Sequence, residues 1–291
     1  MKKLIERLLV FIIGIPAVFS LVIFLPFYHN LILNIVVVFF SGIGAVEFST
    51  MLEKKNIRIS RLESFILGSS APLAVTLYVS FNFPVWIIPV IIFSCAIWAL
   101  VSRVFTRSTE IETITNQIIG GFSLLVYPGL FISWIIFMSG WGYPKAVLLF
   151  IFITFGCDSI AWLAGSLFGA NNRNIISVSP NKSIAGFIGG LLGSMLVAAG
   201  AVLLFPDIYH IFVSQETVLP LSKMITMAAI LGLCTGIAAS LGDLAESAMK
   251  RSCDFKDSGN FMLGRGGVLD SIDSIAVAAP VFYLLFTLFF Q

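Results

Sequence analysis

One stretch of the chain, AVLLFIFITFGCDSIAWLAGSLF (Ala146–Phe168), carries a single charged side chain, Asp158, in its 23 residues. A helix of about 20 mostly apolar residues is long enough to cross the hydrocarbon core of a bilayer. Backbone N–H and C=O groups find no water there, so a spanning segment of this kind pairs them internally as a helix. The stretch therefore predicts a transmembrane helix that holds a carboxylate.

Eight further apolar runs lie on either side of this stretch. They are Leu8–Phe27, Leu31–Phe48, Phe65–Phe81, Val85–Val101, Ile118–Met138, Ile184–Phe205, Ile225–Ser247 and Ser274–Phe290. Of the 291 residues, 58% are hydrophobic and 11% are charged, whereas about a quarter of the residues in a soluble domain are charged. The sequence predicts an all-α polytopic integral membrane protein with about nine transmembrane helices, built as a single transmembrane domain over residues 1–291.

The basic residues predict which side of the membrane each connection faces. With a cytoplasmic N-terminus, 15 of the 17 lysines and arginines fall on the cytoplasmic side: Lys2, Lys3, Arg7, Lys54, Lys55, Arg58, Arg61, Arg103, Arg107, Arg173, Lys182, Lys250, Arg251, Lys256 and Arg265. Lys145 and Lys223 fall on the other side. Because cytoplasmic connections carry an excess of lysine and arginine, we expect the N-terminus in the cytoplasm and the C-terminus outside.

The acidic residues are concentrated in the second half of the chain. Seven of the 15 lie in or beside the last four runs: Asp158, Asp243, Glu246, Asp254, Asp257, Asp270 and Asp273. An ionisable residue inside a span is costly, so each is a candidate functional residue. Glu47 is the acid that the first half places within a span. The sequence leaves it open whether Glu47 is a site residue or reaches the cytoplasmic surface near Lys54.

One polar cluster spans the end of the eighth run, the start of the ninth and the loop between them. Its helix residues recur at i, i+3, i+4 or i+7 and so share faces: Asp243, Glu246, Ser247 and Lys250, then Asp270, Asp273 and Ser274. The loop adds Arg251, Lys256, Asp257, Arg265, Gly266 and Gly267. Carboxylates hold Mg²⁺, cations neutralise phosphate oxygens, and glycines let backbone N–H groups approach an anion. The pattern is typical of phosphoryl transfer to a metal-bound nucleotide; the alternative is a charged loop with incidental salt bridges.

A second cluster surrounds the end of the sixth run and the start of the seventh. Asp158 lies within an apolar span, and Ser179, Lys182 and Ser183 precede the next helix. Free N–H groups at a helix start attract phosphate. The alternative is a turn between helices that glycines such as Gly186 allow to pack closely.

Several motifs, taken together and in order, resemble a known family. They are LGDLAESAMKR (241–251), KDSG (256–259) and GRGGVLDSIDS (264–274), preceded by CDSIAW (157–162) and SPNKSIAGFIGG (179–190). These resemble the motifs of the phosphatidate cytidylyltransferases, also called CDP-diacylglycerol synthases. The resemblance is close from about Gly156 to Pro280.

The resemblance implies a reaction and roles for individual residues. Phosphatidate and CTP would give CDP-diacylglycerol and pyrophosphate, with Mg²⁺ required and a second cation allowed. Asp243 and Asp270 would bind the metal with Asp273 and Glu246 close by, and Lys250 and Arg251 would act beside the two aspartates in catalysis. Substrate binding would fall to Asp158, Ser179, Lys182, Ser183, Ser247, Lys256, Asp257, Arg265, Gly266 and Gly267.

The resemblance also implies partners and a location. CTP, phosphatidate and membrane lipids are the expected partners, nucleic acid is not, and a homodimer stays open. The expected location is the bacterial inner membrane, crossed several times, with the active site facing the cytoplasm. Residues 1–140 would provide scaffold and lipid access, and residues 146–290 the catalytic helices and cytoplasmic loops.

This chain departs from the family's usual motifs at three places. Leu-Gly-Arg265-Gly-Gly stands where Pro-Gly-His-Gly-Gly is usual, Asp270-Ser271-Ile-Asp273 where Asp-Arg-x-Asp is usual, and Asn260 where histidine is frequent. One basic residue is lost and another gained nearby, so Arg265 is expected to supply the positive charge that Ser271 lacks. Unchanged CTP affinity and turnover in Arg265→Ala would contradict that idea.

Two rival functions stay open. One is a CTP-using relative that acts on another lipid, such as a polyprenol kinase or an archaeal-type lipid cytidylyltransferase. The other is a cation transporter with Asp158, Asp243 and Asp270 along its ion path. Transporters often show inverted repeats with interrupted helices in both halves. The crowding of the acids into one half of this chain favours the enzyme.

Overall fold

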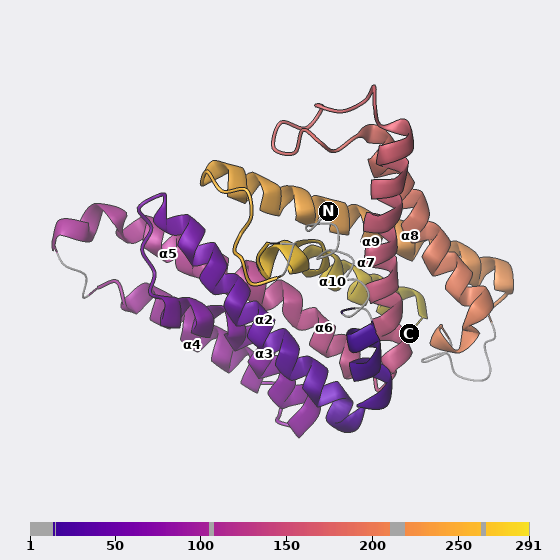
Figure 1. The fold of residues 1–291 in the computed structure, drawn as a ribbon. Coiled ribbons are helices and arrows are strands. Elements are labelled where there is room, and N and C mark those ends of the chain that lie inside the picture. Colours follow the sequence, from indigo (N-terminus) through magenta and orange to yellow (C-terminus); the bar gives the residue numbers. More distant parts are fainter. Residues whose placement is uncertain (1–13, 15, 105–107, 210–218, 263–265, 291) are drawn as a thin grey trace. The chain divides into compact units, whose positions relative to one another are not determined.

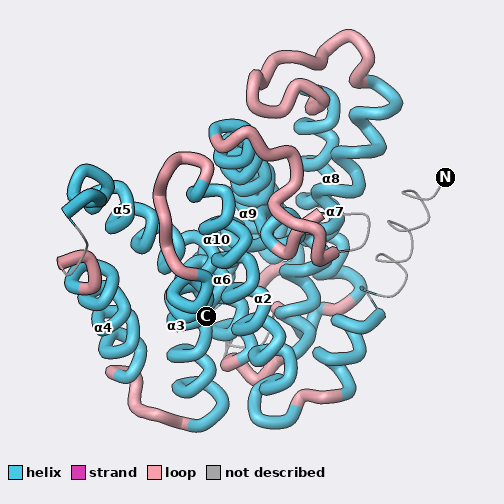
Figure 2. The backbone as a smooth tube through the Cα atoms, turned by 60° about the vertical axis from the view of Figure 1, so that its left-hand side comes forward, coloured by secondary structure: helices cyan, strands magenta, loops and turns pink. Residues whose placement is uncertain are grey.

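The structure of the protein is a computed structural model that describes residue 14 and residues 16–104, 108–209, 219–262 and 266–290. In this part of the chain, helices are joined by loops (Figure 2). The one isolated β-bridge here pairs Met262 with Gly266. Seven helical segments among the described residues have the length and composition to cross a membrane: Phe27–Glu53, Arg61–Phe81, Ile111–Ser139, Pro144–Phe168, Ile184–Leu204, Leu221–Ser252 and Leu269–Phe290. A further apolar helix, Ile87–Val101, has 15 residues.

The helices follow the predicted apolar runs closely. Eight of the nine runs coincide with these segments. The first run, Leu8–Phe27, begins outside the described residues, and its residues 16–24 are helical. The prediction of an all-helical chain with many apolar spans is therefore confirmed, whereas the count of nine and the sides of the two termini stay predictions.

The chain divides into two compact units. The first unit comprises Met1–Gly142 and Met249–Ile272, and the second comprises Tyr143–Ala248 and Asp273–Gln291. The two last helices, Leu221–Ser252 and Leu269–Phe290, each contribute residues to both units. The predicted single domain, with its halves at 1–140 and 146–290, stays a prediction.

The first unit is built on helices α2 to α6 (Figure 1). Their bounds are α2 Phe27–Glu53, α3 Arg61–Phe81, α4 Ile87–Val101, η1 Ser108–Thr113, α5 Ile114–Leu124, η2 Leu125–Leu130 and α6 Phe131–Ser139. Helices α2 and α3 run closely side by side, and the Ser41 hydroxyl donates to the Gly68 carbonyl at 2.6 Å. A Cβ on Gly68 would overlap Ala45. A small residue is therefore required at this crossing.

One predicted helix of the first unit is interrupted. The run Ile118–Met138 forms α5 and α6 with the π-helical turn η2 between them. Pro128 lies in this turn, where its missing N–H and its ring disfavour a regular α-helix. The Pro128 carbonyl shares the single Ser41 hydroxyl proton with the Gly68 carbonyl, which gives a carbonyl in the distorted turn a partner.

The second unit holds α7 Pro144–Phe168, α8 Ile184–Leu204, η3 Pro206–Ile208, and most of α9 Leu221–Ser252 and α10 Leu269–Phe290. Helices α7 and α8 lie side by side, and a Cβ on Gly186 would come within 2.9 Å of the Ala161 carbonyl oxygen. The close packing of the two helices at Gly186, which the sequence indicated, is thus observed. Phe150 and Phe282 pack with their ring centroids 5.3 Å apart and tie α7 to α10.

Candidate functional site

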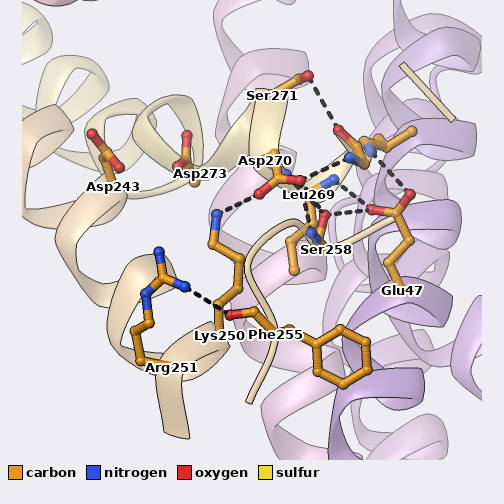
Figure 3. A network of polar contacts seen from close by, with 12 residues as sticks. Glu47, Asp243, Lys250, Arg251, Phe255, Ser258, Leu269, Asp270, Ser271 and Asp273 are labelled. Atoms are coloured by element: carbon orange, nitrogen blue, oxygen red, sulfur yellow. Dashed lines mark hydrogen bonds and ion pairs between the residues drawn. The ribbon is translucent and has the colours of Figure 1, made fainter. Parts of the chain in front are cut away.

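Asp270 lies at the centre of a polar cluster in the first unit (Figure 3). It is the second residue of α10, where the positive end of the helix dipole favours a carboxylate. Its Oδ2 accepts hydrogen bonds from Gly267 N at 2.7 Å, Ser258 N at 2.8 Å and Ser258 Oγ at 2.9 Å. Lys250 forms an ion pair with Oδ1. The side chains of Asp270 and Lys250 are only 7% and 12% exposed. The buried Asp270 carboxylate is therefore stabilised by three hydrogen-bond donors and one ammonium group.

Two glycines allow the loop to close on this carboxylate. Gly266 has φ +101°, a conformation that residues with a Cβ rarely adopt, and a Cβ there would overlap Asp270 Oδ2. A Cβ on Gly267 would overlap both Ser258 Oγ and Glu47 Oε2. The Gly267 N–H donates to the Asp270 carboxylate, whereas the Gly266 N–H donates to the Met262 carbonyl at 3.2 Å. A role of either glycine toward substrate stays a prediction.

Glu47 joins the same cluster from α2. Its Oε1 accepts from Val268 N at 3.0 Å, and its Oε2 accepts from Leu269 N at 2.8 Å and Ser258 Oγ at 3.0 Å. The first N–H groups of a helix have no partner within that helix, and Glu47 supplies one at the start of α10. The sequence indicated Glu47 only as a carboxylate in an apolar span, because its partners lie more than 200 residues away along the chain.

The other predicted residues of the loop are more open to solvent. Arg251, Lys256 and Asp257 are exposed, and Arg251 Nη1 donates to the Phe255 carbonyl at 3.2 Å. Ser271 Oγ donates to the Gly267 carbonyl at 3.3 Å and so braces the loop. Arg265 lies outside the described residues, so the idea that it compensates for Ser271 stays a hypothesis.

The second unit holds its own lysine–aspartate pair. Lys182 Nζ lies 2.6 Å from Asp243 Oδ2, and the two side chains are 32% and 36% exposed. Ser183 Oγ accepts from Gly186 N at 3.0 Å and caps the start of α8. The Ser179 carbonyl accepts from Lys182 N at 3.1 Å in the turn before that cap. The structure therefore joins Lys182 to Asp243 and places Lys182 beside a helix N-terminus.

The remaining predicted residues of the second unit differ in burial. Glu246 is fully buried, Asp273 is 7% exposed, Ser247 is half-buried and Asp158 is exposed on α7. Asp273 Oδ1 accepts from Ser274 N at 2.6 Å and from Ser274 Oγ at 3.2 Å. The roles predicted for these four residues stay predictions.

The oxygen donors present are compatible with magnesium carried by a nucleotide. Within the described residues, no three His, Cys, Asp or Glu side chains gather as a ready-made metal site. Mg²⁺ is normally bound by one or two carboxylates together with substrate phosphates and water, rather than by an all-protein cage. Asp243 and Asp270 are hard oxygen donors of this kind, and each now has a lysine as its counter-charge.

Comparison with known proteins identifies the family. The model of the cytidylyltransferase family matches residues 5–289. The chain belongs to the cytidylyltransferase family. The resemblance seen in the motifs is thereby confirmed over nearly the whole length.

Individual curated proteins match over shorter segments. The phosphatidate cytidylyltransferase of Haemophilus influenzae is 38% identical over 137 residues, covering 47% of this chain and 44% of that protein. The phosphatidate cytidylyltransferase of Thermotoga maritima is 34% identical over 171 residues, covering 58% and 59%. The uncharacterized protein YnbB of Escherichia coli is 30% identical over 171 residues, covering 58% and 52%. The chain spans about half the length of the curated relatives that it matches.

Proposed function

We propose that the chain transfers the cytidylyl group of CTP to phosphatidate, giving CDP-diacylglycerol and pyrophosphate. The observation that carries the proposal concerns Asp243 and Asp270, the two carboxylates predicted to bind metal. Each lies against a lysine, Lys182 or Lys250, in a chain of the cytidylyltransferase family. Paired carboxylates and ammonium groups are the ionic groups that a magnesium–nucleotide complex requires.

The chemistry needs orientation more than it needs a base. The phosphate of phosphatidate is already an anion near neutral pH, so its oxygen can attack the α-phosphorus of CTP without a strong general base. The new P–O bond forms as the bond to the β-phosphate oxygen breaks, and pyrophosphate leaves with that electron pair. Positioning and charge neutralisation therefore dominate the catalysis.

The residues of this chain supply the neutralising groups. Asp243 and Asp270 would hold Mg²⁺, which would supply positive charge to offset the negative charge of the triphosphate. Lys182, which pairs with Asp243, would turn toward a phosphate oxygen, and Lys250 would contribute positive charge from its place beside Asp270. Arg251 and Lys256, both exposed on the loop, would extend the positive field around the triphosphate.

The reaction is proposed for the cytoplasmic face of the bacterial inner membrane. CTP is a water-soluble anion and phosphatidate is a lipid, so the two meet where helix ends reach the headgroup region. The end of α9 and the loop after it carry Lys250, Arg251 and Lys256, and basic residues favour cytoplasmic connections and attract anionic lipid headgroups. The N-terminus is proposed to be cytoplasmic and the C-terminus external.

A different lipid acceptor is the second candidate. Ser271 departs from the usual family motif, and one relative at 30% identity, YnbB, carries no assigned function. A lipid kinase would use the same phosphate-binding groups but would transfer the γ-phosphate of CTP to a lipid hydroxyl. The position of the transferred phosphorus separates the two reactions.

The test uses CTP labelled either in the α-phosphate or in the γ-phosphate. Purified protein in detergent receives phosphatidate, or a polyprenol, with Mg²⁺ or with EDTA. The proposal expects the α-label in a CDP-lipid and the γ-label in pyrophosphate, with phosphatidate and with Mg²⁺ only. Transfer of the γ-label to lipid would instead show a kinase, and failure of folded protein to label phosphatidate would exclude the proposed acceptor.

A further inference from the structure

Glu47 is the one carboxylate of this cluster that the proposed reaction does not use. It lies on α2, far along the sequence from the loop and from the start of α10, yet both of its oxygens accept hydrogen bonds from them (Figure 3). Val268 N and Leu269 N are the donors immediately before Asp270. Glu47 therefore fixes the backbone from which the Asp270 side chain projects.

Ser258 connects the two carboxylates directly. Its Oγ lies 3.0 Å from Glu47 Oε2 and 2.9 Å from Asp270 Oδ2. A hydroxyl has one proton to donate, so the two carboxylates share it. Ser258 is also 4% exposed, and its backbone N–H donates to Asp270 at 2.8 Å. A change in the charge or position of Glu47 thus alters the hydrogen bonding of Asp270 through one side chain.

The surroundings of Glu47 accept a carboxylate but not its amide. A Cβ on Gly259 would come within 2.5 Å of Glu47 Oε1, so the chain approaches this carboxylate closely. Both oxygens face N–H or O–H donors. A glutamine would turn an NH₂ group toward one of those donors and lose an acceptor there.

We propose that Glu47 is a positioning residue for Asp270, acting through Ser258 and through the N–H groups of Val268 and Leu269. The inference rests on the proposed function, in which Asp270 binds the metal of the magnesium–nucleotide complex. Groups that orient a metal ligand through hydrogen bonds commonly affect metal affinity or activity by about 10-fold to 100-fold when they are removed. Glu47→Gln should raise the half-saturating Mg²⁺ concentration by that amount.

The experiment compares four single variants, and the double variant Glu47→Gln/Ser258→Ala, with the parent protein in detergent. The single variants are Glu47→Gln, Glu47→Asp, Ser258→Ala and the control Glu63→Gln. Glu63 is a suitable control because it is a carboxylate of the same unit whose ion-pair partner is Arg103, at 2.6 Å, rather than a residue of the Asp270 cluster. The half-saturating Mg²⁺ concentration is measured with CTP and phosphatidate, per amount of folded protein. Hydrogen exchange of the Gly267 amide, which donates to Asp270 rather than to Glu47, is measured without substrates.

The proposal expects a graded result. Glu47→Gln should raise the half-saturating Mg²⁺ concentration and accelerate exchange at Gly267. Glu47→Asp should show smaller changes in both readouts, because aspartate keeps the negative charge on a side chain that is one methylene shorter. Ser258→Ala should also raise the half-saturating Mg²⁺ concentration and accelerate exchange at Gly267. In the double variant, the rise in the half-saturating Mg²⁺ concentration should be smaller than the two single rises combined. Glu63→Gln should leave both readouts at the parent values.

Two results would overturn the proposal. One is a Glu47→Gln protein that needs the same Mg²⁺ concentration as the parent and protects Gly267 equally. The other is a loss of activity that follows only from a smaller folded fraction, with the Mg²⁺ requirement unchanged. If the parent itself forms no CDP-lipid, the proposed function fails, and exchange at Gly267 still decides whether Glu47 orders the environment of Asp270.

Discussion

The two units each hold a lysine–aspartate pair, and the pairs differ in how much of the chain surrounds them. In the first unit, Asp270 accepts three hydrogen bonds besides its contact with Lys250, and both side chains are largely buried. In the second unit, Asp243 and Lys182 are in contact at 2.6 Å, and about a third of each side chain is exposed. The Lys250–Asp270 pair is thus buried in protein, whereas the Lys182–Asp243 pair is partly exposed to solvent.

This difference in burial indicates that the two pairs have different roles. A buried charge with a full set of donors has a fixed position before any ligand binds, which is what a preorganised electrostatic site requires. An exposed ion pair contributes about 0–1 kcal/mol, so its partners separate readily. Asp270 is therefore expected to act as a fixed anchor, and Lys182 as a cation that can leave Asp243 for a phosphate.

The largest effect on activity is expected for Asp270→Asn. The variant removes the negative charge that would meet the metal, and removal of one such electrostatic group typically costs at least about 100-fold to 1,000-fold in turnover. The initial rate of CDP-diacylglycerol formation at saturating substrates measures it. Asp207→Asn is the control, because Asp207 pairs with Lys145 at 3.6 Å and is 72% exposed. Rates within about threefold of the parent for both variants would contradict the proposed role of Asp270 as a fixed carboxylate for the metal.

The two lysines should differ in their effect on stability. Lys250→Ala leaves Asp270 buried without its counter-charge, and breaking a buried pair in this way costs about 3–5 kcal/mol. Lys182→Ala breaks a partly exposed pair, for which about 0–1 kcal/mol is expected. The free energy of unfolding in mixed detergent micelles measures both. Equal losses would show that the first pair is no more tightly held than the second.

Lys182→Ala should instead reduce the efficiency of the reaction. If Lys182 binds a phosphate, its loss removes a hydrogen bond to a charged group, worth about 1.5–3 kcal/mol, or about 10-fold to 100-fold in kcat/KM. Lys182→Arg keeps the charge and should retain most of the efficiency. A Lys182→Ala enzyme with the parent's kcat/KM for both CTP and phosphatidate would assign the residue to structure alone.

The smallest effect is expected for Ser271→Ala. Its hydroxyl donates one long hydrogen bond, 3.3 Å, to the Gly267 carbonyl, so its removal should change the free energy of unfolding by no more than about 0.5 kcal/mol. Ser258→Ala removes a buried hydroxyl that contacts two carboxylates and should cost more, about 1–3 kcal/mol. The reverse order would mean that the Ser271 hydrogen bond, rather than Ser258, holds the loop in place.

The helices could be predicted from the sequence because the bilayer sets their length and polarity. The apolar runs therefore coincide with helices, with ends shifted by several residues, as for Ile225–Ser247 within α9. The π-helical turn at Leu125–Leu130 could not be predicted, because hydropathy does not distinguish a π-turn from an α-helix. Pro128 and Gly129 are local signals of a distortion there, but they do not specify its type.

The site residues could be predicted by type but not by partner. Helical spacing placed Asp243 and Lys250 on one face of the same helix, seven residues apart. In the structure, their ion-pair partners are Lys182 and Asp270, which come from other segments. Glu47 shows the same limit, because its partners depend on how α2 packs against a loop more than 200 residues later. Long-range packing of this kind leaves no mark on local periodicity.

The most direct test of the account is the conversion of α-labelled CTP and phosphatidate to CDP-diacylglycerol by the parent, Asp243→Asn and Asp270→Asn in parallel. Each folded protein is assayed across a range of Mg²⁺ concentrations. The account predicts Mg²⁺-dependent product from the parent and its loss, by at least about 100-fold, in both variants. Product that forms without Mg²⁺, or that persists in both variants, would contradict it.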